Sequence, residues 1–354
     1  MTIFRDKLHA LADKGLITRR KHPDFPYYIY NYTNEAVHEN EWDDVTRMCR
    51  GLILDEDYNF IARPFEKFFN HYELINNPRL GDIPSSPPDA IFEKMDGSLG
   101  ISYHGPDGTP YISTRGSFES EQAIEGTKIL HEKMTRDKLI LNCNYTYLFE
   151  IIYPENRIIV DYGQKRDLIL LGIIDTKTGL DVSLFENPGF NACNYSILRG
   201  DREDGLDLFE SLKNDPAKDE GEEGFVLCWK NGFRMKIKFE QYLTVARIMA
   251  HLSDKHILDA CANGITLSDN NMLPEEIAEE VLKKEELFLQ QYDTIEYAAR
   301  YLTDSHKHLS RKEFASYVIH NPYTAICFKM YDNKPYDELI WKSMKKQLKE
   351  DSND

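Results

Sequence analysis

The sequence of 354 residues has few features of secreted, membrane-spanning or zinc-binding proteins. Its six cysteines are scattered, and none forms a Cys-x-x-Cys pair, which argues against both a disulfide framework and a zinc site. No apolar run approaches the ~20 residues needed to span a bilayer. The charged N-terminal segment lacks the apolar core of a signal peptide. We therefore expect a cytoplasmic protein with no membrane partner.

Positive charge is also scarce: the 43 Lys and Arg residues are outnumbered by 60 Asp and Glu residues, which gives a formal charge of -17. This balance argues against broad, sequence-independent binding of nucleic-acid phosphates. It leaves open a local basic cleft, because net charge averages over surfaces that a substrate never meets. With 41% hydrophobic and 29% charged residues the chain has the composition of a globular protein, and its length favours two domains.

The chain changes character near residue 241. Before it, apolar spacing predicts helices over residues 4–16 and 119–138, and strand formers predict strands over 27–32, 145–153 and 168–175. After it, helical periodicity dominates, with helices predicted from Pro274, over 309–319 and over 338–348. We therefore predict an α+β fold in which an antiparallel-sheet domain, residues 1–241, is followed by an all-α domain, residues 242–354.

Lys94 stands in the most informative stretch, which runs from Phe92 to Leu99. The lysine follows an apolar, strand-like run and precedes an Asp96-Gly97 turn signal. Glycine lets the backbone approach a ligand closely, and a lysine whose pKa is lowered is a covalent nucleophile. The alternative is an exposed lysine at a strand end before a hairpin turn.

Residues 223–239 form the second informative stretch. An acidic loop is predicted over 215–223, and Asn231-Gly232 between two apolar runs is a strong hairpin signal. In the second arm Arg234, Lys236 and Lys238 alternate with apolar residues, so the three cations share one face. Cations gathered in this way indicate a site for an anion; the alternative is a solvated strand face.

Other charged residues also stand among apolar ones. Glu150 lies inside a strand-like run, where a carboxylate either faces solvent or is buried with a partner. Arg50 and Lys67 are each set among apolar residues, and surface charge is the alternative for both. A hairpin with its turn at residues 106–108 is expected to return Arg115 toward Lys94.

In order and spacing these residues resemble the motifs of the covalent nucleotidyltransferase superfamily of ligases and capping enzymes. Lys94-Met95-Asp96-Gly97 resembles motif I, Phe149-Glu150 motif III, Glu223-Gly224 motif IV and Lys236-Ile237-Lys238 motif V. Within the superfamily the chain is most similar to the RNA ligase 1 family of T-even bacteriophages. The runs that carry this similarity are Cys49-Arg50-Gly51, Arg63-Pro64, Glu66-Lys67-Phe68-Phe69-Asn70, Arg115-Gly116-Ser117 and Asn156-Arg157-Ile158.

The resemblance implies an ATP-grasp-like ligase domain and an ATP-dependent RNA ligase acting through lysyl-AMP and an adenylylated RNA end. The substrate it implies is RNA with 5′-phosphate and 3′-hydroxyl ends, and for this family cleaved tRNA is the expected natural substrate. The implied cofactors are ATP and Mg²⁺ or Mn²⁺. The protein is expected to act as a monomer and, if it is a phage protein, in the host cytoplasm. The alternatives are a DNA ligase or an mRNA guanylyltransferase, which usually carry a β-rich OB domain, and a catalytically idle RNA-binding or scaffold protein.

The same resemblance assigns roles to individual residues. Lys94 is the nucleophile, and free lysine, with a pKa of ~10.4, must become less basic to attack near neutral pH. Nearby cations, desolvation and a metal act in that direction. Phe69 is expected in the core or against the phosphate pocket, and Arg115 departs from the lysine of the family pattern. The implied site comprises Lys94, Lys236 and Lys238 as catalytic residues, Arg50, Lys67, Gly97, Arg115, Glu150, Glu223, Lys236 and Lys238 as ATP contacts, and Glu150 and Glu223 as metal contacts, through water where needed.

Overall fold

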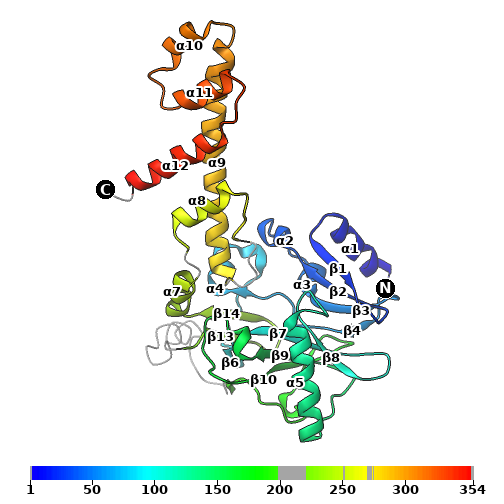
Figure 1. Ribbon diagram of the computed structural model, residues 1–354. Helices are drawn as coiled ribbons and strands as arrows, with labels where there is room; N and C mark the ends of the chain where they lie inside the picture. The colour runs from blue at the N-terminus through cyan, green and yellow to red at the C-terminus, as the bar shows by residue number, and fades with distance from the viewer. Residues whose placement is uncertain (1, 198–220, 250–251, 269–272, 274, 352–354) are drawn as a thin grey trace. The chain divides into compact units, whose positions relative to one another are not determined.

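The computed structural model describes residues 2–197, 221–249, 252–268, 273 and 275–351 (Figure 1). Its chain divides into two compact units, Met1–Tyr242 and Leu243–Asp354. Residues 215–220 of the predicted acidic loop lie outside the described residues, as does Pro274.

The first unit begins with a four-stranded antiparallel sheet in the order β1-β2-β3-β4. Helix α1 (Thr2–Asp13) shares an apolar core with it, and Gly15, at φ +74°, lets the chain turn from the helix into β1. Helix α1 therefore ends before the predicted limit of residue 16. The other elements of this part are β1 (Ile17–Lys21), β2 (Tyr27–Tyr32), α2 (Asn34–His38), α3 (Asp44–Met48), β3 (Arg50–Asp55) and β4 (Phe60–Ala62).

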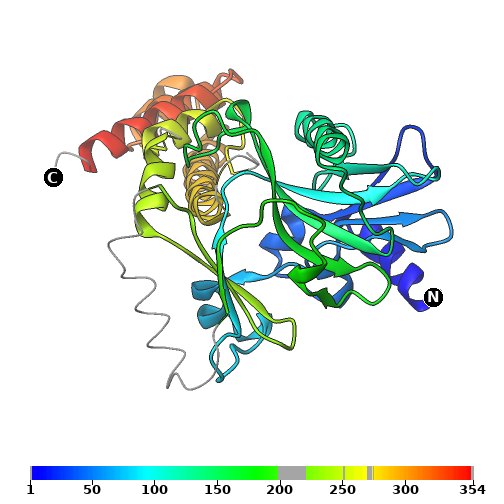
Figure 2. The same ribbon diagram turned by 90° about the horizontal axis from the view of Figure 1, so that it is seen from below.

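A second sheet has the order β11-β10-β9-β7-β8 and is antiparallel throughout. Helix α5 (Glu121–Asp137) packs on it (Figures 1 and 2). Ser120 caps the helix by accepting a hydrogen bond from the Ala123 amide. The strands predicted over 145–153 and 168–175 are confirmed as its central pair. The strands are β7 (Ser98–His104), β8 (Pro110–Ser113), β9 (Tyr145–Ile152), β10 (Asp167–Asp175) and β11 (Asp181–Val182).

A third sheet, in the order β12-β6-β13-β14-β5, carries the residues that the sequence singles out. The predicted hairpin is confirmed as β13 and β14, joined by a loop in which Gly232 adopts φ +84°. The pairing is antiparallel except between β14 and β5. The strands are β5 (Phe69–Asn70), β6 (Ala90–Lys94), β12 (Tyr195–Ile197), β13 (Gly224–Cys228) and β14 (Arg234–Lys238), and the short helix α4 (His71–Asn76) follows β5.

The described part of the second unit consists of helices joined by turns and short loops. The 32-residue helix α9 is its spine, and α8, α11 and α12 pack against it (Figure 1). Ser310 and Glu313 form a capping box at the start of α10, the helix predicted over 309–319. The helices are α7 (Glu240–Met249), which begins in the first unit, then α8 (Asp254–Ala262), α9 (Glu275–His306), α10 (Arg311–Val318), α11 (Thr324–Tyr331) and α12 (Asp337–Asp351).

The predicted class is thus confirmed: an α+β fold with antiparallel sheets is followed by helices. Beyond Phe239 the described part of the chain contains helices and turns but no strand, and so no OB-like β-barrel. Among the helices of the described residues, none has the length and apolar character needed to cross a membrane.

Candidate active site

Lys94 is the last residue of β6 and lies beside the hairpin of β13 and β14. Gly224 of β13 pairs with Lys94 on one side and with Lys238 on the other, so the two lysines lie on the same face of the sheet. The carboxylate of Glu223 joins them: its Oε1 lies 2.6 Å from Lys94 Nζ and 3.2 Å from Lys238 Nζ. The side chains of Glu223 and Lys238 are 4% and 6% exposed and therefore buried, whereas the side chain of Lys94 is 22% exposed.

Gly224 makes this cluster possible. It adopts φ +149°, a conformation that residues with a side chain rarely adopt. A Cβ added there would lie 2.0 Å from the carbonyl oxygen of Ile237. The glycine therefore lets β13 lie close against β14 while the chain carries Glu223 onto the face that holds the two lysines.

Lys236 lies on the same face, two residues before Lys238. It pairs with Val226 of β13 and with Asn70 of β5, and it is 9% exposed. The alternative of a solvated strand face is therefore wrong for Lys236 and Lys238. The residues on the opposite face, Met235, Ile237 and Phe239, are buried as predicted.

Glu150 approaches Lys94 from the second sheet. It lies on β9 opposite Leu99, and a Cβ added to Gly97 would lie 3.1 Å from its Cγ. The missing side chain of Gly97 thus lets the turn after Lys94 lie directly against β9. Burial raises the pKa of Glu150 to about 8; Lys94 opposes this shift, and Glu223 adds to it. A solvent-facing Glu150, one of the two sequence alternatives, is therefore wrong.

The acidic groups could bind a divalent cation whose other ligands are water molecules and phosphate oxygens. In the described residues no side chain hydrogen-bonds or ion-pairs with the Glu150 carboxylate, and a buried carboxylate of raised pKa gains from a cation. Glu223 supplies a second carboxylate. The described part of the chain contains no group of three or more His, Cys, Asp or Glu residues that could enclose a metal alone. Mg²⁺ needs no such cage, because it usually keeps several waters.

Asp96 has a role that the sequence reasoning missed. Its carboxylate is buried and accepts hydrogen bonds from the Ile159 and Val160 amides at 2.8 and 2.7 Å and from the Tyr242 hydroxyl at 2.8 Å. Its own amide donates to the Tyr162 hydroxyl at 2.9 Å. Asp96 therefore fixes the turn after Lys94 to two distant segments. Only the residue type, a carboxylate in a turn before glycine, could have signalled this.

A second group of cations gathers around aromatic rings at the N-terminal sheet. Lys67 is 5% exposed, and its Nζ lies 5.8, 5.4 and 5.1 Å from the ring centroids of Tyr32, Trp42 and Phe69. Such contacts stabilise a cation. Surface charge, the sequence alternative for Lys67, is therefore wrong, and Phe69 is a buried residue beside it.

Arg50 and Arg115 lie close to this group. Arg50 begins β3, its guanidinium lies 5.6 Å from the Phe68 ring, and its charge acts on Glu150. Arg115 follows β8 and donates a hydrogen bond to the Tyr32 hydroxyl at 3.0 Å. The structure thus brings Lys94, Glu223 and Lys238 into direct contact and gathers Lys67 and Arg115 around Tyr32. Glu150 lies close enough to Lys94, Glu223 and Arg50 for their charges to shift its pKa.

Comparison with known proteins gives one family match: residues 48–243, more than half of the chain, match the model of a family described as RNA ligase. The match includes every residue of the site described above except Tyr32 and Trp42.

Individual relatives are more distant. The chain is 25% identical over 315 residues to an RNA ligase of Rhodothermus phage RM378, covering 70% of each protein. It is 28% identical over 256 residues to a protein of Autographa californica nuclear polyhedrosis virus that is provisionally named a bifunctional polynucleotide kinase/RNA ligase. That match covers 66% of this chain but 35% of the viral protein, so the chain corresponds to about a third of the length of that relative.

Solved structures resemble the chain at low identity. A protein of Aquifex aeolicus that is provisionally named an ATP-dependent DNA ligase superposes with a TM-score of 0.49 at 16% identity, covering 92% of this chain and 80% of its own.

Proposed function

The chain belongs to the RNA ligase family, and on that premise we propose that it is an ATP-dependent RNA ligase that joins 5′-phosphate and 3′-hydroxyl ends. Residues 1–241 form the adenylyltransferase domain, and residues 242–354 form a helical domain that contributes to the choice of RNA. The observation that carries this proposal is the cluster in which one oxygen of Glu223 contacts both Lys94 and Lys238, with Glu150 close by.

In the first step Lys94 Nζ attacks the α-phosphorus of ATP. A bond forms between nitrogen and phosphorus, the bond from phosphorus to the bridging oxygen breaks, and pyrophosphate leaves with the electron pair. The amine loses one proton in this step. Glu223 Oε1, 2.6 Å from Nζ, is placed to accept it.

The cations of the site match the charge that shifts during this step. Lys236 and Lys238 hold the α-phosphate, and Arg50 and Lys67 hold the β- and γ-phosphates and orient the leaving pyrophosphate. Mg²⁺ or Mn²⁺, held by Glu150 and Glu223 directly or through water, supplies further positive charge at the phosphates when bound. Glu150 also contacts the nucleotide ribose.

In the second step an oxygen of the RNA 5′-phosphate attacks the phosphorus of lysyl-AMP. A 5′–5′ pyrophosphate bond forms, the phosphorus–nitrogen bond breaks, and the Lys94 amine leaves and regains its proton. In the third step a 3′-hydroxyl attacks that 5′-phosphate, a phosphodiester bond forms and AMP leaves. The proposed natural substrate is a cleaved tRNA in the cytoplasm, and the proposed enzyme acts as a monomer.

The first experiment tests the covalent step. The protein is incubated with α-labelled ATP and magnesium and then run on a denaturing gel. We expect label on the wild type and none on Lys94→Ala. Lys94→Arg is also expected to stay unlabelled, because an always-charged guanidinium cannot act as the nucleophile. A labelled Lys94→Ala protein would refute the assignment of the nucleophile.

The second experiment tests the class of substrate. We expect 5′-phosphorylated single-stranded RNA to be circularised or joined, while a nick in duplex DNA stays open. Efficient sealing of the DNA nick would assign the chain to DNA repair. Label from GTP but not from ATP would assign it to mRNA capping.

A further inference from the structure

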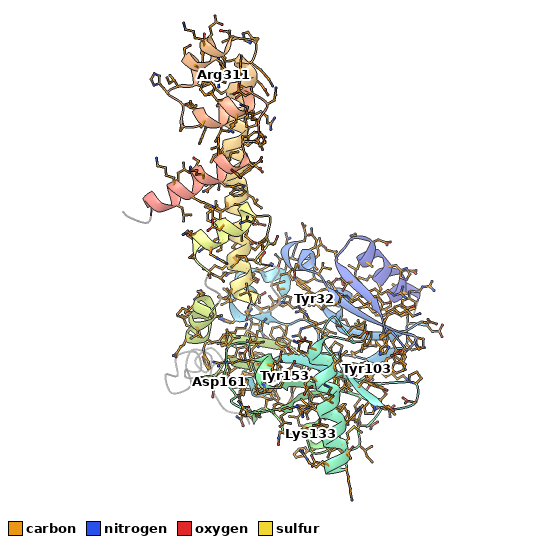
Figure 3. The ribbon with its side chains drawn as sticks, in the orientation of Figure 1. Tyr32, Tyr103, Lys133, Tyr153, Asp161 and Arg311 are labelled. Atoms are coloured by element: carbon orange, nitrogen blue, oxygen red, sulfur yellow. The ribbon has the colours of Figure 1, made fainter. Side chains whose placement is uncertain are left out.

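Tyr32 lies at the end of β2 (Figure 3). Its side chain contacts two cations of the proposed ATP site. It is 5% exposed, and its hydroxyl oxygen accepts a hydrogen bond from Arg115 Nη1 at 3.0 Å. The Arg115 guanidinium carbon lies 5.0 Å from the centroid of the same ring, and Lys67 Nζ lies 5.8 Å from it. One aromatic side chain therefore contacts both cations.

The ring is itself held in place by its neighbours. Trp42 packs edge-on against Tyr32 at 5.0 Å between ring centroids, and Phe69 packs against Trp42 at 5.5 Å. The Tyr32 amide donates to the carbonyl of Cys49 at 2.6 Å, which ties the end of β2 to the residue before Arg50. Tyr32 thus has little freedom to move relative to the start of β3.

The backbone brings Arg115 to the same place. A Cβ added to Gly51 would lie 3.2 Å from the Cα of Arg115, so the glycine after Arg50 lets the segment that carries Arg115 lie directly against β3. Three cations, Arg50, Lys67 and Arg115, are therefore gathered around the end of β2 and the start of β3. Guanidinium and ammonium groups gathered in this way can bind a phosphate group through charge-assisted hydrogen bonds.

We infer that Tyr32 is a positioning residue that holds Arg115 and Lys67 in place for the β- and γ-phosphates of ATP, and so for the pyrophosphate that leaves. This inference rests on the proposed function. The phenol oxygen gives the planar guanidinium of Arg115 a fixed acceptor, so Arg115 can take a defined orientation.

This role separates the steps of the reaction. The β- and γ-phosphates take part in the formation of lysyl-AMP and in its reversal by pyrophosphate. They are absent when AMP passes from preformed lysyl-AMP to RNA. Loss of the Tyr32 hydroxyl is therefore expected to weaken the use of ATP and pyrophosphate while it leaves AMP transfer to RNA unchanged.

The test compares Tyr32→Phe with Tyr103→Phe in the full-length protein. Tyr103 is a matched control: it is also buried, and its hydroxyl bonds to His22 Nε2 at 3.0 Å, in an aromatic cluster that includes neither Arg115 nor Lys67. Self-adenylylation is measured against the concentration of α-labelled ATP, and loss of label from the adenylylated protein is measured against pyrophosphate. The rate of AMP transfer to 5′-phosphorylated RNA is measured from the adenylylated protein alone.

We expect Tyr32→Phe to raise the half-saturating concentrations of ATP and of pyrophosphate about five- to tenfold, the size of effect expected for loss of one ordinary hydrogen bond. The rate of AMP transfer to RNA and all values for Tyr103→Phe stay at wild-type levels. In the double variant Tyr32→Phe/Arg115→Ala, the ATP value matches that of Arg115→Ala alone, because the hydroxyl acts through Arg115.

Two results would overturn the inference. One is a Tyr32→Phe protein with wild-type ATP and pyrophosphate dependence. The other is an equal loss in nucleotide use and in AMP transfer to RNA, which would indicate a general structural role. In both cases the wild-type protein still becomes labelled with AMP. If the proposed function itself were wrong, the wild-type protein would take up no label, so the two failures can be told apart.

Discussion

Gly224 offers the sharpest test of how the backbone builds the candidate site. The variant Gly224→Ala places a methyl group 2.0 Å from the Ile237 carbonyl oxygen and 2.8 Å from the Lys238 Cα, at a φ of +149°. Both neighbours are backbone atoms, so no flexible side chain can move aside. Strands β13 and β14 must separate, or the chain at Glu223 must turn away from the lysines.

The size of the effect follows from these distances. Relief of the overlap requires a backbone shift of more than an ångström, and overpacking together with an unfavourable φ costs roughly 2–4 kcal/mol of the free energy of unfolding. Glu223 then no longer contacts Lys94 and Lys238 together. We expect self-adenylylation at saturating ATP to fall by at least tenfold per folded molecule, alongside the loss of stability in urea unfolding.

Gly232 provides the matched control on the same hairpin. It also has a positive φ, +84°, but a Cβ added there would meet nothing within 4 Å. Gly232→Ala should therefore cost about 1 kcal/mol from the backbone conformation alone and leave labelling intact. The reasoning is refuted if the two variants lose the same stability, or if Gly224→Ala labels itself at the wild-type rate.

Two further outcomes follow from buried charges. Burial raises the pKa of Glu150 from its ordinary value near 4.5 to about 8. The protonated carboxyl therefore contributes its full share to the stability of the folded protein below about pH 4, and this contribution is lost as the pH rises to about 8. In metal-free buffer the stability of Glu150→Gln relative to wild type should therefore increase between about pH 5 and pH 8 in urea unfolding, and a constant difference would contradict the raised pKa. Lys133 of α5 pairs with Asp167 at 2.6 Å, and both side chains are 9% exposed. The Asp167 carboxylate also accepts hydrogen bonds from Asn191 and from the Leu168 amide, so Lys133→Ala removes its counter-ion alone and should cost about 3 kcal/mol, the lower end of the range for a broken buried ion pair. Self-adenylylation per folded Lys133→Ala molecule should not change, and a selective loss of labelling would place α5 in the catalytic machinery.

Local sequence patterns were sufficient to predict the β-hairpin of the site and the direction in which its lysines point. Asn231-Gly232 between apolar runs predicted the hairpin, and strand alternation predicted that Lys236 and Lys238 share a face. The same alternation could not tell whether that face meets water. Burial of the two lysines depends on β6 and β5, which come from residues 90–94 and 69–70, far away in the sequence.

Contacts between distant segments were beyond the sequence for the same reason. The bond from Arg115 to Tyr32 spans 83 positions, and the bond from Tyr242 to Asp96 spans 146. Neither tyrosine differs in its local pattern from the many others in a chain with 21 tyrosines. Residue type and spacing locate the charged groups, whereas the side chains that orient them are selected by tertiary packing.

The buried position of the cations also explains how an acidic chain can use anionic substrates. A formal charge of -17 argued against broad, sequence-independent binding of nucleic-acid phosphates but left open a local basic cleft. Lys67, Lys236 and Lys238 are all nearly inaccessible to solvent, so each acts at short range in a medium of low dielectric constant, where a charge contact is far stronger than at the surface. Exposed carboxylates act more weakly on a phosphate bound beside these lysines, because salt and water screen the exposed charges. Net charge therefore describes the outer surface of this protein, and the chemistry of the site follows from the charges that the sheets enclose.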